Sequence, residues 1–386
     1  MERFDWTKAI QTNIFLLKIQ GLWPEGDGTY QSNVYRLYAI IAILMQTGHV
    51  IFQTINLFLT LNDLEATTGI IFMLIEEIMV ILKMYCLLKN MKMLKQLLIT
   101  LNDDLFQPKN LQQRGLVQPS LNAWTTIISA VRLFATGWLV SWCSFPFLDN
   151  TYREHRLPFL AWYPYNSKVS PFYELTYCYQ VIAITYLCMA NVNIDTLIAA
   201  LNMYIGAQFD ILCDDLRNFH EISENASGTT NAKLKKCIHH HREILKFAEQ
   251  TNEFYNWLLF IQFVVCGISI GLAIFHLTLS TPFTSKFYSL ISYSGGITGE
   301  VFLYCWFGNE IQIKSGQLSY ALFESDWISL SPEVRKNLII FMLKVQKSLN
   351  ISALGLFNLS LDTFMKIMRT AWSYFALLRQ VNSPAL

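Results

Sequence analysis

Long apolar stretches divide this chain into seven candidate membrane spans. A helix that crosses a bilayer needs about 20 mostly apolar residues, and stretches of this kind recur along the whole sequence. They cover residues 34–60, 66–89, 123–147, 174–203, 257–280, 287–308 and 351–380. The sixth is the least apolar, because the polar and glycine-rich run SYSGGITGE interrupts it. The pattern predicts an all-α membrane protein with seven transmembrane helices.

Periodic apolar residues continue outside these spans. From Ile198 to Phe219 they recur every three or four positions, which predicts an amphipathic helix that leaves the membrane after the fourth span. Residues 222–232 are typical of a flexible break, and residues 233–256 predict a further helix. Within 308–349, Ser331 and Pro332 predict the N-cap and the first turn of another helix. Together these segments predict a helical layer beside the membrane.

The last span separates polar from apolar residues by side. Successive helical residues are about 100° apart, and this spacing gives two opposite stripes. The polar stripe holds Asp362, Thr363, Lys366, Arg369, Thr370 and Ser373, and the apolar stripe holds Phe364, Ile367, Met368, Ala371, Phe375 and Leu378. One side suits lipid or protein, whereas the other requires water or polar partners.

The distribution of basic residues predicts the orientation of the spans. Of the 29 Lys and Arg residues, 19 lie in the N-terminal segment and in the loops after the second, fourth and sixth spans. Five lie on the other side, and the remaining five lie within spans. Because positive charge favours the cytoplasmic side, we expect a cytoplasmic N-terminus and an extracellular C-terminus. This is the inverse of a G-protein-coupled receptor, whose signalling mode is the least favoured alternative.

Composition narrows the function further. Only 15% of residues are charged and the net charge is +1, which argues against nucleic acid or acidic substrates. The first residues lack a signal peptide's apolar core, so we expect the first span to direct membrane insertion. The eight cysteines form no C-x-x-C pair. Cys143 and Cys178 are expected at the same end of adjacent helices, either as free thiols or as a disulfide.

The sequence offers little support for catalysis, metals or cofactors. His239, His240 and His241 are consecutive, so on a helix they point about 100° apart and cannot converge on one ion. Motifs for nucleotide binding, zinc proteases and serine hydrolases are absent from the sequence. The patch of Gly295, Gly296 and Gly299 is better explained by close helix packing than by phosphate binding. We therefore expect neither an enzyme nor a bound cofactor.

Charged residues inside the spans indicate either function or internal ion pairs. They are Glu76, Glu77, Lys83, Arg132, Asp195 and Glu300. A charge in the bilayer core is costly, so each of them needs a partner. Glu76 and Lys83 share one helix face, and Arg132 could pair with a carboxylate of another helix. Ion pairs that hold the bundle together are the favoured interpretation.

Aromatic residues gather in the predicted outer halves of the third, fourth and sixth spans. They are Trp138, Trp142, Phe145, Phe147, Tyr173, Tyr177, Tyr179, Tyr288 and Tyr293. Aromatic belts are common at membrane interfaces. An apolar cavity with a few polar groups would equally suit a small volatile ligand, and the sequence leaves both interpretations open.

Several short motifs, in order along the whole chain, resemble those of the insect odorant receptor family. The fourth span carries Asp195-Thr196-Leu197 and then Gln208-Phe209, and the following loop carries Cys237-Ile238 and His241. The next loop carries Leu318, Ala321, Trp327 and Gln346. The most specific piece is the end, with Leu361, Phe364, Ile367 and the run Ser373-Tyr374-Phe375-Ala376-Leu377-Leu378.

The resemblance implies an odorant receptor subunit of a ligand-gated, non-selective cation channel in the membrane of sensory neuron dendrites. Four subunits, usually including the shared odorant co-receptor, would surround one pore lined by the last helix. Small volatile odorants would bind in each subunit's outer half, at Met73, Phe134, Trp138, Ser141, Tyr177, Gln180, Ile184 and Tyr293. Assembly is assigned to the loop before the last span, at Leu318, Ala321, Trp327 and Phe341, with Leu322 and Leu338 beside them.

The same resemblance places the gate near the chain's end, at Ser373, Leu377, Gln380 and Val381. An apolar ring of Leu377 and Val381 would close the pore by excluding water. Lys366 and Arg369 are unusual lining for a cation pore; they could pair with Asp362, reach the inner lipid headgroups, or be outweighed by acidic residues of partner subunits. A gustatory receptor subunit is the alternative, since its typical ending is partly matched by Ser373-Tyr374 and Gln380.

The expected organisation is one membrane domain over residues 1–386. It consists of a cytoplasmic N-terminal segment (1–33), a ligand-binding bundle of six helices (34–307), a cytoplasmic assembly segment (308–350) and a pore-lining helix (351–381).

Overall fold

Helices dominate the computed structural model, which describes residues 3–26, 29–62, 64–148, 150–219 and 227–382. The α-helices are α1 (Gln11–Ile19), α2 (Asn33–Leu59), α3 (Leu64–Lys89), α4 (Met91–Leu101), α5 (Leu111–Leu148), α6 (Phe172–Arg217), α7 (Ser227–Leu279), α8 (Ser285–Glu324), α9 (Pro332–Val345) and α10 (Leu361–Asn382). Short 3₁₀ turns cover Trp6–Ile10 (η1), Asp104–Phe106 (η2) and Thr151–Glu154 (η3), and one hairpin pairs β1 (Ser352–Ala353) with β2 (Phe357–Asn358).

Four segments of the described chain are long and apolar enough to cross a membrane by length and composition. They are Asn33–Leu59, Leu111–Ser144, Phe172–Arg217 and Thr230–Leu279. The predicted first and second spans, 34–60 and 66–89, coincide with α2 and α3 to within two residues. The predicted third, fourth and sixth spans lie inside α5, α6 and α8, and the fifth lies in α7 except for its last residue; each of these helices extends beyond the predicted span on at least one side.

Helices α6 and α7 are much longer than a bilayer requires. They contain 46 and 53 residues, which at 1.5 Å per residue corresponds to roughly 70–80 Å. The expected boundary between separate helices at 233–256 and 257–280 is wrong, because α7 runs through both without a break. α8 likewise continues past residue 308 to Glu324. Neither junction contains a proline, and the intrahelical hydrogen bonds continue through polar residues as well as apolar ones.

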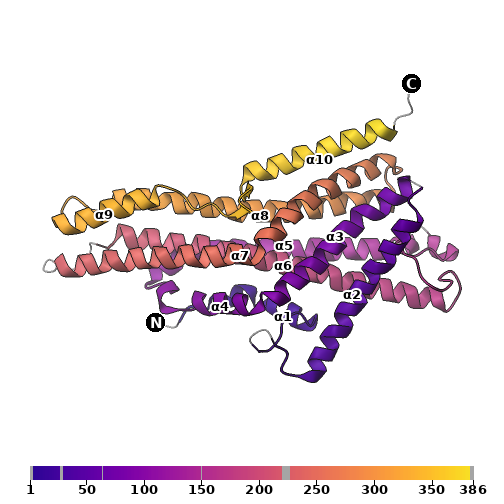
Figure 1. Ribbon diagram of the computed structural model, residues 1–386, viewed down its shortest axis with the longest axis horizontal. Helices are drawn as coiled ribbons and strands as arrows, with labels where there is room; N and C mark the ends of the chain where they lie inside the picture. The colour runs from indigo at the N-terminus through magenta and orange to yellow at the C-terminus, as the bar shows by residue number, and fades with distance from the viewer. Residues whose placement is uncertain (1–2, 27–28, 63, 149, 220–226, 383–386) are drawn as a thin grey trace.

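The extended helix ends form a second layer beside the spans. We call this the extension layer; it consists of α4, α9 and residues 198–217, 227–256 and 309–324 of α6, α7 and α8. It lies at the end of the long axis near the N-terminus, whereas the last turn of α10 lies at the opposite end (Figure 1). The predicted helical layer is therefore present. Its flexible break falls partly on residues 222–226, outside the described residues, while residues 227–232 are helical.

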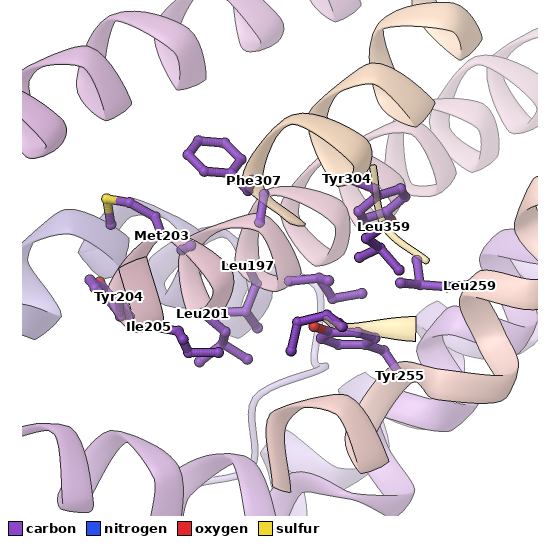
Figure 2. Close-up of a cluster of buried hydrophobic side chains, with 14 of the residues drawn as sticks. Leu197, Leu201, Met203, Tyr204, Ile205, Tyr255, Leu259, Tyr304, Phe307 and Leu359 are labelled. Carbon is purple, nitrogen blue, oxygen red and sulfur yellow. The ribbon is translucent and has the colours of Figure 1, made fainter. Parts of the chain in front are cut away.

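Helix α6 is the core of the extension layer rather than an amphipathic helix with one wet face. The predicted apolar positions, including Leu201 and Phe209, are buried, but so are polar positions between them. Asn202 accepts a 2.6 Å hydrogen bond from Tyr255, and the Gln208 side chain donates to the Phe106 carbonyl at 3.0 Å. Figure 2 shows side chains of α6 meeting those of α7 and α8 in this region. Surrounding helices, which a periodic pattern does not reveal, cover the polar face.

The three consecutive histidines of α7 face different surroundings. His239 is exposed beside Glu243, the His240 Nε2 lies 3.1 Å from the Gln208 Oε1, and the His241 ring packs edge-on against a phenylalanine of α9. Burial lowers the pKa of His240 to about 3 and that of His241 to about 4. Both buried histidines are therefore neutral at neutral pH and serve as packing residues.

The last helix begins ten residues later than the sequence predicts. A small antiparallel hairpin pairs Ala353 with Phe357, and Leu354 and Gly355 at its turn have φ angles of 52° and 70°. Two consecutive left-handed residues cannot be part of a right-handed helix. The expected start at 351 is therefore wrong, and α10 begins at Leu361.

Glycine 308 of α8 brings the hairpin close to the bundle. A Cβ atom at Gly308 would lie 2.2 Å from the Cβ of Leu359 and 2.5 Å from its carbonyl oxygen. Leu359 is itself buried and directly precedes α10. Only glycine permits this approach, which fixes where the last helix departs from α8.

Candidate functional site

A cavity of about 420 Å³ lies between α3, α5, α6 and α8. Its lining is mostly apolar, and five of the eight predicted ligand-binding residues contribute to it: Met73, Phe134, Trp138, Ile184 and Tyr293. The volume is within the range of pockets that enclose a small organic molecule. The structure thus places these five residues around one space, while their role in binding stays a prediction.

The glycine patch of α8 helps to form this cavity. Gly295, Gly296 and Gly299 are all lining residues. A Cβ atom at Gly296 would lie 3.3 Å from the Phe134 ring of α5, whereas one at Gly299 would meet no atom within 4 Å. Close packing, the expected explanation, therefore applies at Gly296. At Gly299 the missing side chain leaves open space.

The remaining three predicted residues lie away from the lining. The Tyr177 hydroxyl donates to the Cys143 carbonyl, and the Ser141 and Ser289 hydroxyls lie 3.4 Å apart. Both Cys143 and Cys178 are free thiols. Ser141, Tyr177 and Gln180 are therefore not among the residues that line this cavity. Equal depth in a bundle does not imply that side chains face the same space.

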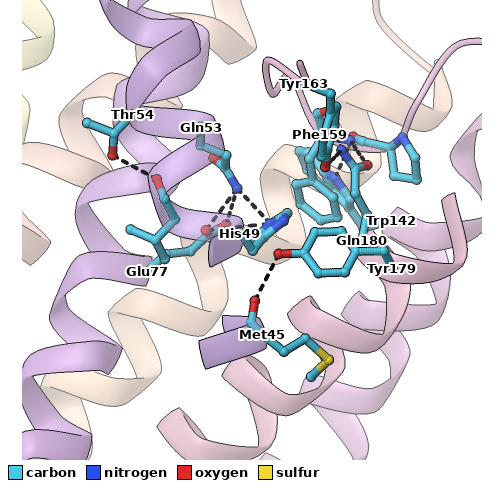
Figure 3. A network of polar contacts seen from close by, with 12 residues as sticks. Met45, His49, Gln53, Thr54, Glu77, Trp142, Phe159, Tyr163, Tyr179 and Gln180 are labelled. Atoms are coloured by element: carbon cyan, nitrogen blue, oxygen red, sulfur yellow. Dashed lines mark hydrogen bonds and ion pairs between the residues drawn. The ribbon is translucent and has the colours of Figure 1, made fainter. Parts of the chain in front are cut away.

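Gln180 anchors the segment between α5 and α6. Its Oε1 accepts from the Phe159 amide, and its Nε2 donates to the Phe159 carbonyl and the Tyr163 hydroxyl, each at 3.1 Å. Trp142 stacks on Phe159, with ring centroids 6.0 Å apart. Figure 3 shows this amide between the connecting segment and the helices. Gln180 is therefore a positioning residue for the segment that connects α5 to α6.

A buried ion cluster lies next to the cavity. The Lys83 ammonium is completely buried and lies 2.7 Å from both Asp195 and Glu300. It also donates to the Asn191 side chain at 2.6 Å, and Tyr304 donates to Asp195 at 2.6 Å. One cation thus joins α3 to α6 and α8, as expected for ion pairs that hold a bundle together. Because carboxylates from two other helices surround Lys83, the cluster constrains how these helices can move.

Arg132 does not follow the expected pattern. Its guanidinium donates to the Asn13 side chain at 3.0 Å, and the structure shows no salt bridge from it to any described carboxylate. Asn13 in turn donates to Thr196 at 2.6 Å. The expected ion pair across helices is therefore wrong, and the N-terminal helix α1 supplies a neutral partner instead.

A second polar cluster was not predicted. The Gln53 amide nitrogen lies 2.9 and 2.8 Å from the two carboxylate oxygens of Glu77, and 2.8 Å from His49 Nε2 (Figure 3). All three side chains are buried. The signal was present in the first span, where Gln46, His49 and Gln53 recur at helical spacing. Gln53 donates to a carboxylate of α3 that also lines the cavity.

The polar stripe of α10 faces away from the rest of the chain. Ile367 and Phe375 are buried, whereas Ser373, Leu377 and Gln380 are exposed, with Leu377 at 59%. A Cβ atom at Gly271 of α7 would lie 2.9 Å from the Ala371 carbonyl oxygen, so the two helices are in close contact. No other described part of the chain covers this exposed side of α10, so it can contact water or another molecule.

Two residues of the polar stripe, Lys366 and Thr363, make contacts within the chain. Lys366 pairs with Asp362 at 2.7 Å, which was one of the expected arrangements for this cation. Thr363 was assigned to the polar stripe but is buried; its backbone amide donates to the Ser360 hydroxyl at 3.3 Å, so Ser360 caps the start of α10. The side chain of Val381 lies outside the described residues.

The predicted assembly residues are mostly internal. Leu318, Ala321 and Phe341 are buried within this chain's own extension layer, as are Leu322 and Leu338, while Trp327 is half-buried. The expectation that a partner subunit is needed to bury these side chains is wrong, because helices of this chain's own extension layer already bury most of them. Exposed apolar side chains lie on the other faces of α8 and α9: Tyr320, Phe323, Ile339, Ile340 and Leu343.

Comparison with known proteins gives one consistent answer. The family model for the 7tm odorant receptor matches residues 63–372. The chain is 23% identical to odorant receptor Or1 of Anopheles gambiae, covering 99% of this chain and 97% of that protein, and 22% identical to odorant receptor 94a of Drosophila melanogaster, covering 98% and 99%. In fold it is similar to olfactory receptor OR5 of Machilis hrabei, solved with eugenol, with a TM-score of 0.87 at 18% identity over 98% of this chain and 100% of that one.

Proposed function

The chain belongs to the odorant receptor family, and on this premise we propose that it is the odorant-binding subunit of a ligand-gated cation channel. The family match favours this function over that of a gustatory receptor. Membership also makes the chain a multi-pass membrane receptor. The proposed location is the plasma membrane of sensory neuron dendrites.

The cavity is the observation that carries the proposal. It is mostly apolar, is lined by four helices and has a volume suited to a small volatile molecule. Trp138 and Tyr293 present aromatic rings to it at a centroid separation of 6.2 Å. Large flat rings supply much apolar contact with little loss of conformational entropy. A volatile compound that offers few hydrogen bonds would bind there mainly through apolar contact.

The orientation follows from charge. We infer a cytoplasmic N-terminus and extension layer, and an extracellular end for α10, from the bias of Lys and Arg toward one side. The structure supports this inference by gathering α4, α9 and the ends of α6 to α8 at the end of the molecule near the N-terminus (Figure 1). The cavity lining lies within the predicted spans, so the cavity is then on the extracellular side of the extension layer.

The pore is assigned to α10. Its exposed polar stripe would face water in an assembly with co-receptor subunits, and Leu377 would contribute to an apolar constriction near the outer end. The exposed apolar side chains of α8 and α9 replace the buried residues as the proposed subunit contact, since leaving apolar area in water costs roughly 25 cal/mol per Å². Tyr320, Phe323 and Leu343 are the most exposed of these.

Current recording tests this function. Cells that express the chain with the co-receptor should pass odorant-evoked current against a broad odorant panel, and cells with this chain alone should not. Trp138→Ala should change which odorants activate, while Leu133→Ala, on the outward face of the same helix, should not. Absence of any evoked current despite surface expression would contradict the proposal.

A further inference from the structure

The cavity lining is unusually acidic for an apolar pocket. It contains four carboxylates, Glu76, Glu77, Asp195 and Glu300, and its described lining residues include no Lys, Arg or His. Lys83 lies behind the lining and contacts two of the four. Charged groups in a low-dielectric interior are costly unless each is paired. The partners of each carboxylate therefore show where the site is incomplete.

In three of the four carboxylates, no oxygen is left both buried and without a hydrogen-bond partner in the described structure. Asp195 and Glu300 share Lys83, and Glu300 also accepts a hydrogen bond from Asn191 at 3.1 Å. Glu77 accepts from the Gln53 amide through both oxygens. These groups form the structural part of the polar floor.

Glu76 is different. Its Oε2 accepts from the Gln262 amide at 3.1 Å, but its Oε1 is buried and has no hydrogen-bond partner among the described residues. The hydroxyl of Ser269 lies beside the same carboxylate, so both donors near Glu76 are uncharged. A buried acceptor without a donor costs more than a made hydrogen bond returns. Glu76 thus lines the cavity with a carboxylate that has only neutral donors beside it.

We propose that the ligand is a small amine whose ammonium group binds the Glu76 carboxylate, with its apolar part against Phe134 and Trp138. This inference rests on the proposed function and specifies its ligand class. An ammonium supplies both the missing donor and a positive charge where carboxylates outnumber the nearby cation. The aromatic rings around the rest of the cavity also favour a cation over a neutral group.

The cavity lining also offers a hydrogen-bond donor, which would favour a different class of ligand. The indole nitrogen of Trp138 also lines the cavity and is buried without an acceptor in the described structure. It would favour a ligand that carries only an acceptor, such as a ketone. The two possibilities predict opposite rankings for compounds that share one skeleton.

A matched ligand series separates them. The probes are 2-phenylethylamine, 2-phenylethanol and benzyl methyl ketone, applied both in current recording with the co-receptor and in thermal-shift measurements on the purified complex. We expect the amine to be effective at a concentration about tenfold or more below that of the alcohol, the scale of one charge-assisted hydrogen bond. Equal potency of the three compounds, or preference for the ketone, would overturn the inference.

Variants of Glu76 locate the effect. Glu76→Gln should remove the preference for the amine over the alcohol, whereas Glu174→Gln, at an exposed position on α6, should keep wild-type selectivity. Glu76→Asp retains the charge one methylene further back, so its preference should move to 3-phenylpropylamine. This conservative variant keeps the test decisive if Glu76→Gln folds poorly.

The readouts distinguish failure of the ligand class from failure of the function. Evoked current from other odorants without any response or thermal shift from the amine would overturn the amine inference and leave the receptor function intact. Absence of current with every odorant, together with an amine-induced thermal shift that depends on Glu76, would support the site and contradict the channel.

Discussion

Replacing Gly308 by alanine tests the contact that positions the start of α10. The new Cβ would lie 2.2 Å from the Leu359 Cβ, 2.5 Å from its carbonyl oxygen and 3.0 Å from its carbonyl carbon. An ordinary carbon contact is about 3.5 Å or longer, so the hairpin must move by about 1 Å. Two of the three atoms belong to the backbone, and a change of rotamer alone cannot relieve the overlap.

The cost follows from overpacking a filled site. Such insertions destabilise by typically about 1–3 kcal/mol. Alanine also gains about 1 kcal/mol of helix propensity over glycine, which would hide part of the effect. Gly316→Ala, two turns along the same helix, has the same propensity gain, and its Cβ would meet no atom within 4 Å. The difference between the two variants therefore isolates the packing term.

Thermal unfolding of the purified complex measures this difference. Gly308→Ala should unfold at a temperature several degrees below that of Gly316→Ala, and its odorant-evoked current should fall because α8, which lines the cavity, no longer holds Leu359 in place. Equal unfolding temperatures for the two alanine variants would refute the argument that this glycine sets the position of α10.

Three further substitutions test the other parts of the molecule. Lys83→Met leaves two buried carboxylates without their shared cation and should destabilise the protein by about 3–5 kcal/mol in thermal unfolding; adding Glu300→Gln should recover part of this loss, and full stability of the single variant would contradict the ion-pair argument. Leu377→Ser should admit water and raise the resting current, whereas Leu378→Ser, which is half-buried against the bundle, should not; unchanged current in both would exclude a pore-facing stripe. Phe323→Ser should reduce co-purification with the co-receptor without lowering thermal stability, and intact co-purification would place the subunit contact elsewhere.

Hydropathy and periodicity located most helices correctly because both are local properties. The first two spans match α2 and α3 closely, and α9 begins at Pro332 with Ser331 as its N-cap residue, as the sequence predicts. The two faces of α10 also follow from helical spacing, apart from Thr363. In each case the deciding residues lie within a few turns of one another.

The sequence does not show in the same way which distant residues or surfaces contact one another. The sequence indicates that Lys83 needs an anionic partner, but Asp195 and Glu300 are more than one hundred positions away. The apolar stripe around Leu318 is equally compatible with a partner subunit and with this chain's own helices. Only packing of the full bundle selects between these alternatives.

The sequence by itself determined a seven-span helical membrane protein, because the length and periodicity of apolar runs are encoded in neighbouring residues. The resemblance to the odorant receptor family came separately, from short motifs in order along the chain. The tertiary structure alone decided that α7 is continuous, that a hairpin precedes α10, that the predicted assembly residues are mostly internal and that Lys83 contacts both Asp195 and Glu300. Each of these depends on which surfaces meet in three dimensions. Burial and hydrogen bonding are determined by those long-range contacts, and no local pattern records them.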